Sequence, residues 1–171
     1  MDLRLKDKTG LVTRASSGIG RGIALALGAE GVRLALVARR EERLQEVAAG
    51  ITAKGGPAPV VIAADLMQPA APEQIAAAAL KALGPVEILV NNAGGSRPFK
   101  LGASEQQWDE ALTLNFIRQR QLTDRLLEPM IGLKRGRIIN ITGKSEPEGV
   151  NGAFCAKAAM HAWSKGLSRE V

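Results

Sequence analysis

The stretch G-L-V-T-R-A-S-S-G-I-G, residues 10–20, decides the fold expected for this chain. Its first four residues form a short strand-like run, and residues 19–30 have the pattern of a helix that ends at Gly31. A strand, a glycine-containing loop and a helix in this order direct free backbone N–H groups at whatever lies above the strand end. Such a helix N-terminus favours an anion, for example a pyrophosphate. Glycine at positions 18 and 20 lets the ligand and the sheet approach the backbone closely.

The rest of the chain repeats this alternation of strand and helix. Strand-like runs occur at 10–13, 32–38, 59–64, 86–90 and 136–142. Helical stretches lie at 19–30, 41–54, 73–83 and 104 to about 128, and a last one starts near residue 152. Nothing in this order suggests hairpins, so we expect a parallel sheet covered on both faces. The pattern predicts an α/β fold with three layers, a doubly wound parallel sheet of the Rossmann type, as a single domain over residues 1–171.

Helix signals support several of these boundaries. Pro72 lies in the first turn of the third helix and Gly84 follows its end, as helix termini prefer. Ser104 and Gln107 have the spacing of a capping box, which opens the long fourth helix. Pro129 is expected to end that helix.

Composition narrows the classes of protein that the chain can represent. The single cysteine, Cys155, rules out an internal disulfide and favours a reducing, cytoplasmic compartment. We find no long apolar run and no signal-peptide pattern, so no membrane partner is expected. The net charge is +6, but the basic residues are scattered and no aromatic residues lie among them. We therefore expect no nucleic-acid partner, and no residue spacing points to a metal.

Two arginines stand where the second strand ends. In a dinucleotide-binding fold, a carboxylate at this position binds the ribose 2′-hydroxyl of NAD. Here the residues are Arg39 and Arg40, and the first acid, Glu41, already belongs to the next helix. Because arginine binds phosphate with two parallel hydrogen bonds, the pair suits a 2′-phosphate. If the chain binds a dinucleotide, we expect NADP(H) rather than NAD(H).

Further motifs follow at consistent spacing. Together they resemble those of the short-chain dehydrogenase/reductase family of the classical bacterial type, over essentially the whole chain. The matching pieces are A-S-S-G-I-G at 15–20, Ala64-Asp65-Leu66, Asn91-Asn92-Ala93-Gly94, Asn115, and residues 136–141 leading to the helix that carries Lys157.

The resemblance implies an NAD(P)(H)-dependent oxidoreductase that interconverts a carbonyl and a secondary alcohol of a small molecule by hydride transfer. Asp65 would hold the adenine ring, the loop at 91–94 would line the nicotinamide side, and Lys157 would bind the nicotinamide ribose. The full set of cofactor-binding residues expected from the loop, the arginine pair and the resemblance is Thr13, Arg14, Ser16, Ser17, Gly18, Ile19, Gly20, Arg39, Arg40, Asp65, Leu66, Asn91, Ala93, Gly94 and Lys157.

The resemblance also implies catalytic residues. Asn115 would bind a water in a proton relay, and Lys157 would lower the pKa of a tyrosine four residues before it, which acts as the acid. A hydroxyl after the fifth strand would polarise the substrate carbonyl, and both Thr142 and Ser145 are candidates.

The chain departs from the family pattern at three places. The tyrosine position is Ala153, and the chain contains no tyrosine. The loop from Thr142 to the last helix is shorter than the family pattern. Arg14 replaces the first glycine of the family's loop, either as an extra ligand of the 2′-phosphate or as a plug that impairs cofactor binding. Of these two interpretations we favour the plug.

The last residues, S-K-G-L-S-R-E-V at 164–171, lack a helix stop signal. Because the family's fold continues with further strands, we expect a domain that is incomplete at its C-terminus and a fifth strand with an exposed hydrophobic edge. The resemblance implies a homo-oligomer, either a dimer or a tetramer.

Three hypotheses for function remain open. The chain is an NADP(H)-preferring reductase in which water replaces the tyrosine, a non-catalytic dinucleotide-binding or scaffold protein, or an inactive truncated relic of an enzyme. In each case we expect catalysis to be impaired.

Overall fold

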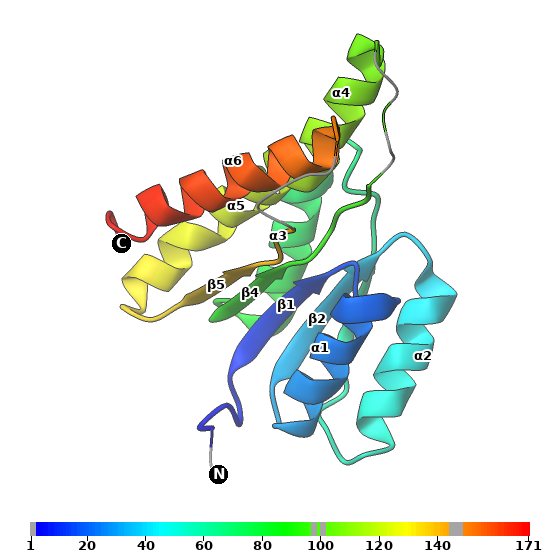
Figure 1. Cartoon of the computed structure of the whole chain (residues 1–171). Coiled ribbons are helices and arrows are strands. Elements are labelled where there is room, and N and C mark those ends of the chain that lie inside the picture. Colours follow the sequence, from blue (N-terminus) through cyan, green and yellow to red (C-terminus); the bar gives the residue numbers. More distant parts are fainter. Residues whose placement is uncertain (1–2, 97–98, 100–101, 144–148) are drawn as a thin grey trace.

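Five parallel strands form one sheet in a computed structural model of the chain, which describes residues 3–96, 99, 102–143 and 149–171. The sheet order is β3-β2-β1-β4-β5 (Figure 1). The strands are β1 (Thr9–Thr13), β2 (Arg33–Ala38), β3 (Val60–Ala63), β4 (Ile88–Asn91) and β5 (Arg137–Asn140), and each pairs in parallel with its neighbours. The predicted α/β fold with a doubly wound parallel sheet is confirmed.

Helices connect the strands. They are α1 (Gly18–Ala29), α2 (Glu41–Thr52), α3 (Ala71–Leu83), α4 (Glu105–Leu112), the π-helical turn η1 (Thr113–Ile117), α5 (Arg118–Gly132) and α6 (Gly152–Leu167). The capping box of Ser104 and Gln107 is confirmed at the start of α4. The prediction that Pro129 ends the long helix is wrong, because α5 continues to Gly132. Its last turn places Met130 in the core, at 4% exposure, and this burial offsets the backbone hydrogen bond that proline lacks.

The core consists of two apolar layers, one on each face of the sheet. Leu11 and Val12 follow each other in β1 and are both fully buried, because successive strand side chains point to opposite faces. Leu11 packs in the cluster that contains residues of α3 and α5, and Val12 packs with residues of α1 and α2. The predicted three-layer arrangement follows from this division.

The strand order reverses direction between β1 and β4. From β1 the chain proceeds through β2 to β3 on one side and then crosses to β4 on the other. In open parallel sheets, ligands bind outside the carboxyl ends of the strands at such a switch point. The described part of the chain has no helix long and apolar enough to span a membrane.

Candidate cofactor and active site

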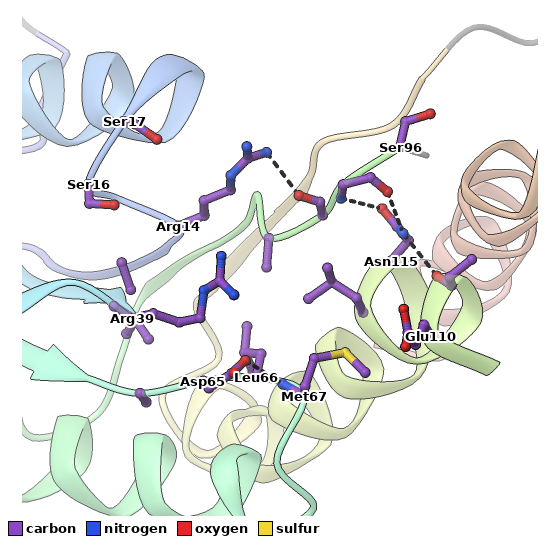
Figure 2. A pocket seen from close by; sticks show the side chains of 18 of the residues that line it. Arg14, Ser16, Ser17, Arg39, Asp65, Leu66, Met67, Ser96, Glu110 and Asn115 are labelled. Atoms are coloured by element: carbon purple, nitrogen blue, oxygen red, sulfur yellow. Dashed lines mark hydrogen bonds between the residues drawn. The ribbon is translucent and has the colours of Figure 1, made fainter. Parts of the chain in front are cut away.

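A cleft of about 670 Å³ opens at the carboxyl edge of the sheet (Figure 2). Ten of its lining residues belong to the set expected from the sequence: Arg14, Ser16, Ser17, Arg39, Arg40, Asp65, Leu66, Ala93, Gly94 and Asn115. They come from the ends of β1, β2, β3 and β4 and from η1. The structure thus brings together residues that lie up to about a hundred positions apart in the chain.

The glycine loop joins β1 to α1. Ser17 is the N-cap of α1 and makes no side-chain cap hydrogen bond, so the first N–H groups of the helix have no partner from this residue. Gly18 has φ +55°, a left-handed conformation that favours glycine. A Cβ on Gly20 would lie 2.4 Å from both Arg14 O and Asn92 Nδ2. The loop therefore requires glycine at both positions and leaves its donors available to an anion.

Arg14 spans the cleft beside this loop. Its backbone has φ +52°, an unfavourable value for a residue with a Cβ. Its Nη1 donates a hydrogen bond of 2.9 Å to Gly94 O, on the loop that follows β4 (Figure 2). The exposed guanidinium thus connects two loops that a dinucleotide would have to separate or pass.

Two arginines and an aspartate lie at the other end of the cleft. Arg39 and Arg40 follow β2 and are exposed, and Figure 2 shows Arg39 extending into the cleft. Asp65 follows β3, and its Oδ1 accepts a hydrogen bond of 3.0 Å from the Met67 N–H. Asp65 lines the cleft at this turn.

Buried polar side chains brace the loop after β4. The Thr13 hydroxyl accepts hydrogen bonds of 2.9 Å from the N–H groups of Asn92 and Ala93. The Asn91 amide donates to Thr123 Oγ1 at 2.9 Å and to Asn140 Oδ1 at 2.8 Å. Thr13 and Asn91 therefore shape the site from below, and neither lines the cleft.

The π-helical turn η1 positions Asn115. The Asn115 Oδ1 accepts from Gly95 N at 3.1 Å, and its Nδ2 donates to Gly95 O at 3.0 Å and to Ala111 O at 2.9 Å. A Cβ on Gly94 would lie 2.7 Å from Asn115 Oδ1, so only glycine permits this approach. One turn later, Gln119 Nε2 donates to Ala93 O at 2.7 Å. Single π turns of this kind occur frequently at functional sites.

Lys157 reaches the same loop from α6. Its Nζ donates a hydrogen bond of 3.4 Å to Ala93 O. Burial lowers the pKa of the Lys157 ammonium to about 8. Ala153, one turn earlier on α6, is buried, and its N–H is bonded to the N-cap residue Asn151 at 2.9 Å.

The remaining expected residues that the structure describes, Lys157 among them, do not line the cleft. Gly18, Ile19 and Gly20 form the start of α1, and Ile19 points to solvent with 64% exposure. Thr142 is exposed and does not line the cleft, and Ser145 lies outside the described residues. Of the two candidate hydroxyls, that of Thr142 is therefore not in the site.

The cleft also contains lining residues that sequence reasoning missed. They are Met67, Phe99, Gln107 and Glu110, together with small residues such as Ala111. Gln119 was missed as well, although its position four residues after Asn115 places both on one helix face. Across the described ranges, no group of histidine, cysteine and acidic residues is arranged to hold a metal.

Comparison with known proteins identifies the family. The model of the short chain dehydrogenase family matches residues 8–171, and the chain belongs to this family. An uncharacterized oxidoreductase of Staphylococcus epidermidis is 34% identical over 98% of this chain and 73% of its own length. The predicted short-chain dehydrogenase family is confirmed, and the relatives that the chain matches are oxidoreductases.

Solved structures agree with this assignment. L-sorbose reductase of Gluconobacter frateurii, complexed with NADPH and L-sorbose, has a TM-score of 0.95 and 29% identity, covering 100% of this chain and 66% of the other. A metagenomic short-chain oxidoreductase in complex with NADP has a TM-score of 0.91 and 33% identity, covering 97% of this chain and 77% of the other.

Proposed function

We propose that the chain binds NADP(H) in preference to NAD(H) in the cleft and reduces a small carbonyl compound slowly. The observation that carries this proposal is Arg39, which extends into the cleft from the end of β2. A carboxylate at this place would bind a ribose 2′-hydroxyl, whereas a guanidinium suits a 2′-phosphate. The neighbouring Arg40 adds a second cation to the same end of the cleft.

The described residues fit a dinucleotide along the cleft. The N–H groups at the start of α1 would hold the pyrophosphate, and Asp65 would hold the adenine. Ala93 and Gly94 would line the nicotinamide side, and the Lys157 ammonium would bind the nicotinamide ribose. When bound, the nicotinamide supplies the hydride that reduces the carbonyl carbon.

Catalysis is expected to be slow because the site lacks a phenol. Ala153 occupies the family's tyrosine position, so the usual acid is absent. A dinucleotide-binding protein without turnover is the second candidate, and Arg14 favours it because its bond to Gly94 O crosses the cleft. Assembly into a dimer or tetramer stays a prediction of the family resemblance.

Fluorescence titration of the purified chain with NADPH and with NADH tests the cofactor preference. We expect NADPH to bind at least about tenfold more tightly, since a hydrogen bond to a charged group contributes roughly 1.5–3 kcal/mol. Arg39→Ala should remove most of this preference by weakening NADPH binding alone.

Arg43→Ala is the matched control, because Arg43 is exposed on α2 and pairs with Glu46. It should leave both affinities unchanged. Equal affinities of the wild-type chain for the two cofactors, or an equal loss of both in Arg39→Ala, would contradict the proposal. Saturable binding with no reduction of any carbonyl would favour the second candidate.

A further inference from the structure

Ala153 and, one turn later, Lys157 lie on α6; neither lines the cleft, but Lys157 contacts the loop after β4 that does. In an α-helix, side chains lean toward the N-terminus, so a residue at i+4 covers the residue at i. The lysine side chain therefore leans toward the turn of Ala153, which is buried and has no side-chain atom beyond Cβ. Lys157 is thus a titratable side chain one turn from the position of the missing phenol.

The contacts of Lys157 fix its ammonium at the nicotinamide end of the cleft. Its Nζ donates to Ala93 O at 3.4 Å and lies 3.5 Å from the position that a Cβ on Gly94 would occupy. Ala93, Gly94 and Asn115 all line the cleft. An ammonium has three N–H donors, and the described residues accept one of them.

From this geometry we infer that Lys157 itself delivers the proton to the substrate oxygen in this chain. The inference rests on the proposed function, because it requires a bound cofactor and a carbonyl substrate. It assigns to Lys157 a catalytic role that goes beyond holding the ribose or adjusting the pKa of another group. Water as the direct acid is the alternative that the experiment must exclude.

The electrostatics of the site support this role. Burial brings the pKa of Lys157 down to about 8, so that the ammonium is protonated at neutral pH and is a stronger acid than a free lysine. Five charged residues line the same cleft: Arg14 on the glycine loop, Arg39 and Arg40 after β2, Asp65 after β3, and Glu110 on α4. On α6 itself, Cys155 and His161 are exposed and point to solvent.

As the carbonyl carbon gains the hydride, the two π electrons of the C=O bond move to its oxygen. One N–H bond of the Lys157 ammonium breaks, an O–H bond forms, and the product is the alcohol. Lys157 is left as a neutral amine, which regains a proton from water before the next turnover. The overall reaction consumes one NADPH and one proton, and it releases NADP⁺.

The test combines a binding measurement, a titration and a rate. NADPH binding is first measured by fluorescence for the wild type, Lys157→Arg, Lys157→Met and the control Lys165→Met, an exposed lysine on the same helix. The ¹³C resonance of the Lys157 Cε is then titrated in the cofactor-free protein, and it is assigned by its loss in Lys157→Arg. Finally, single-turnover reduction of 2,3-butanedione by NADPH is followed between about pH 6 and pH 10.

We expect the Cε resonance to titrate near pH 8 and the reduction rate to fall about tenfold per pH unit above the same value. Lys157→Arg should keep NADPH affinity within about threefold, because it retains the charge. Its reduction rate should fall at least about a hundredfold, the size of effect that general acids contribute. Lys165→Met should match the wild type in all three measurements.

Binding of NADPH with a rate that is flat through pH 8, or with full activity in Lys157→Arg, would overturn the inference and leave water as the acid. NADPH binding without any reduction would overturn it in favour of a non-catalytic protein. Absence of NADPH binding in the wild type would contradict the proposed function itself, and the inference would fall with it.

Discussion

Arg14 occupies a position where the family's loop has glycine, and of the chain's departures from the family pattern it has the largest effect on the cleft. A left-handed conformation costs a residue with a Cβ about 1–2 kcal/mol, and Arg14 adopts one at φ +52°. Its guanidinium is bonded to Gly94 O rather than directed to the end of β2. Of the two interpretations drawn from the sequence, this contact favours a plug over a ligand of the 2′-phosphate.

Replacing Arg14 by glycine should therefore improve cofactor binding. Arg14→Gly removes the bond across the cleft and gives the left-handed position its preferred residue. We expect NADPH and NADH to gain affinity by a similar factor, on the order of tenfold, in parallel fluorescence titrations. If Arg14 instead bound the 2′-phosphate, the substitution would weaken NADPH binding and leave NADH binding unchanged.

At the scale of elements, α4, η1 and α5 form one continuous helical segment that positions Asn115. The sequence predicted one continuous helix with Asn115 inside it, and the capping box at Ser104 was correct. The π turn at Thr113–Ile117 could not be predicted, because no local pattern marks it; Asn115 within it bonds both Ala111 O and Gly95. Gly95 reaches Asn115 only when the loop after β4 packs against this helical segment.

Asn115→Leu tests how far this element supports the site. Leucine has a similar size but removes both hydrogen bonds to Gly95, which is exposed, and a typical hydrogen bond contributes roughly 0.5–1.5 kcal/mol to stability. We expect a loss of that size in the free energy of unfolding, measured with urea, and weaker NADPH binding because the loop at Gly94 loosens. Gln106→Leu, on the exposed face of α4, should change neither quantity. An unaltered stability in Asn115→Leu would show that Gly95 finds other partners.

Some residues of the site could be predicted from the sequence, and others could not. The order of strands and the glycines at 18 and 20 follow from local pattern, and so their place beside the cleft was predictable. Phe99, Gln107 and Glu110 line the cleft only because α4 lies over the loop after β4, and no local pattern marks that packing. The bond between Arg14 and Gly94 O likewise joins residues that lie 80 positions apart.

At the scale of the whole molecule, Glu87 holds two distant segments to β4 at the end of the sheet opposite the cleft. Its Oε1 accepts from Lys8 Nζ at 3.0 Å and pairs with Arg135 Nε at 2.8 Å, and its Oε2 accepts from Thr9 N at 3.3 Å. Burial raises the pKa of the Glu87 carboxyl, but the hydrogen bonds and the positive charges of Lys8 and Arg135 outweigh it and lower the pKa overall. The start of β1 and the segment after α5 are thus held to β4 by one carboxylate.

Glu87→Gln should destabilise the protein in a pH-dependent way. Because the pKa is lower in the folded protein than its usual 4.5, the ionised carboxyl contributes its full stability above that pH, and the contribution is lost as the pH falls through the folded value. Urea unfolding at pH 7 should show a loss of roughly 1–2 kcal/mol in Glu87→Gln, since charge-assisted hydrogen bonds are replaced by neutral ones.

In urea unfolding at about pH 3 the difference between the wild type and Glu87→Gln should be smaller than at pH 7, because the wild-type carboxyl gains protons as the pH falls toward its folded pKa. Glu46→Gln is the matched control: its pair with Arg43 is exposed on α2, and such pairs contribute at most about 0.5 kcal/mol. The same loss at both pH values would mean that Glu87 acts through packing rather than through charge. No loss at pH 7 would mean that Lys8 and Arg135 do not hold the segments together through this carboxylate.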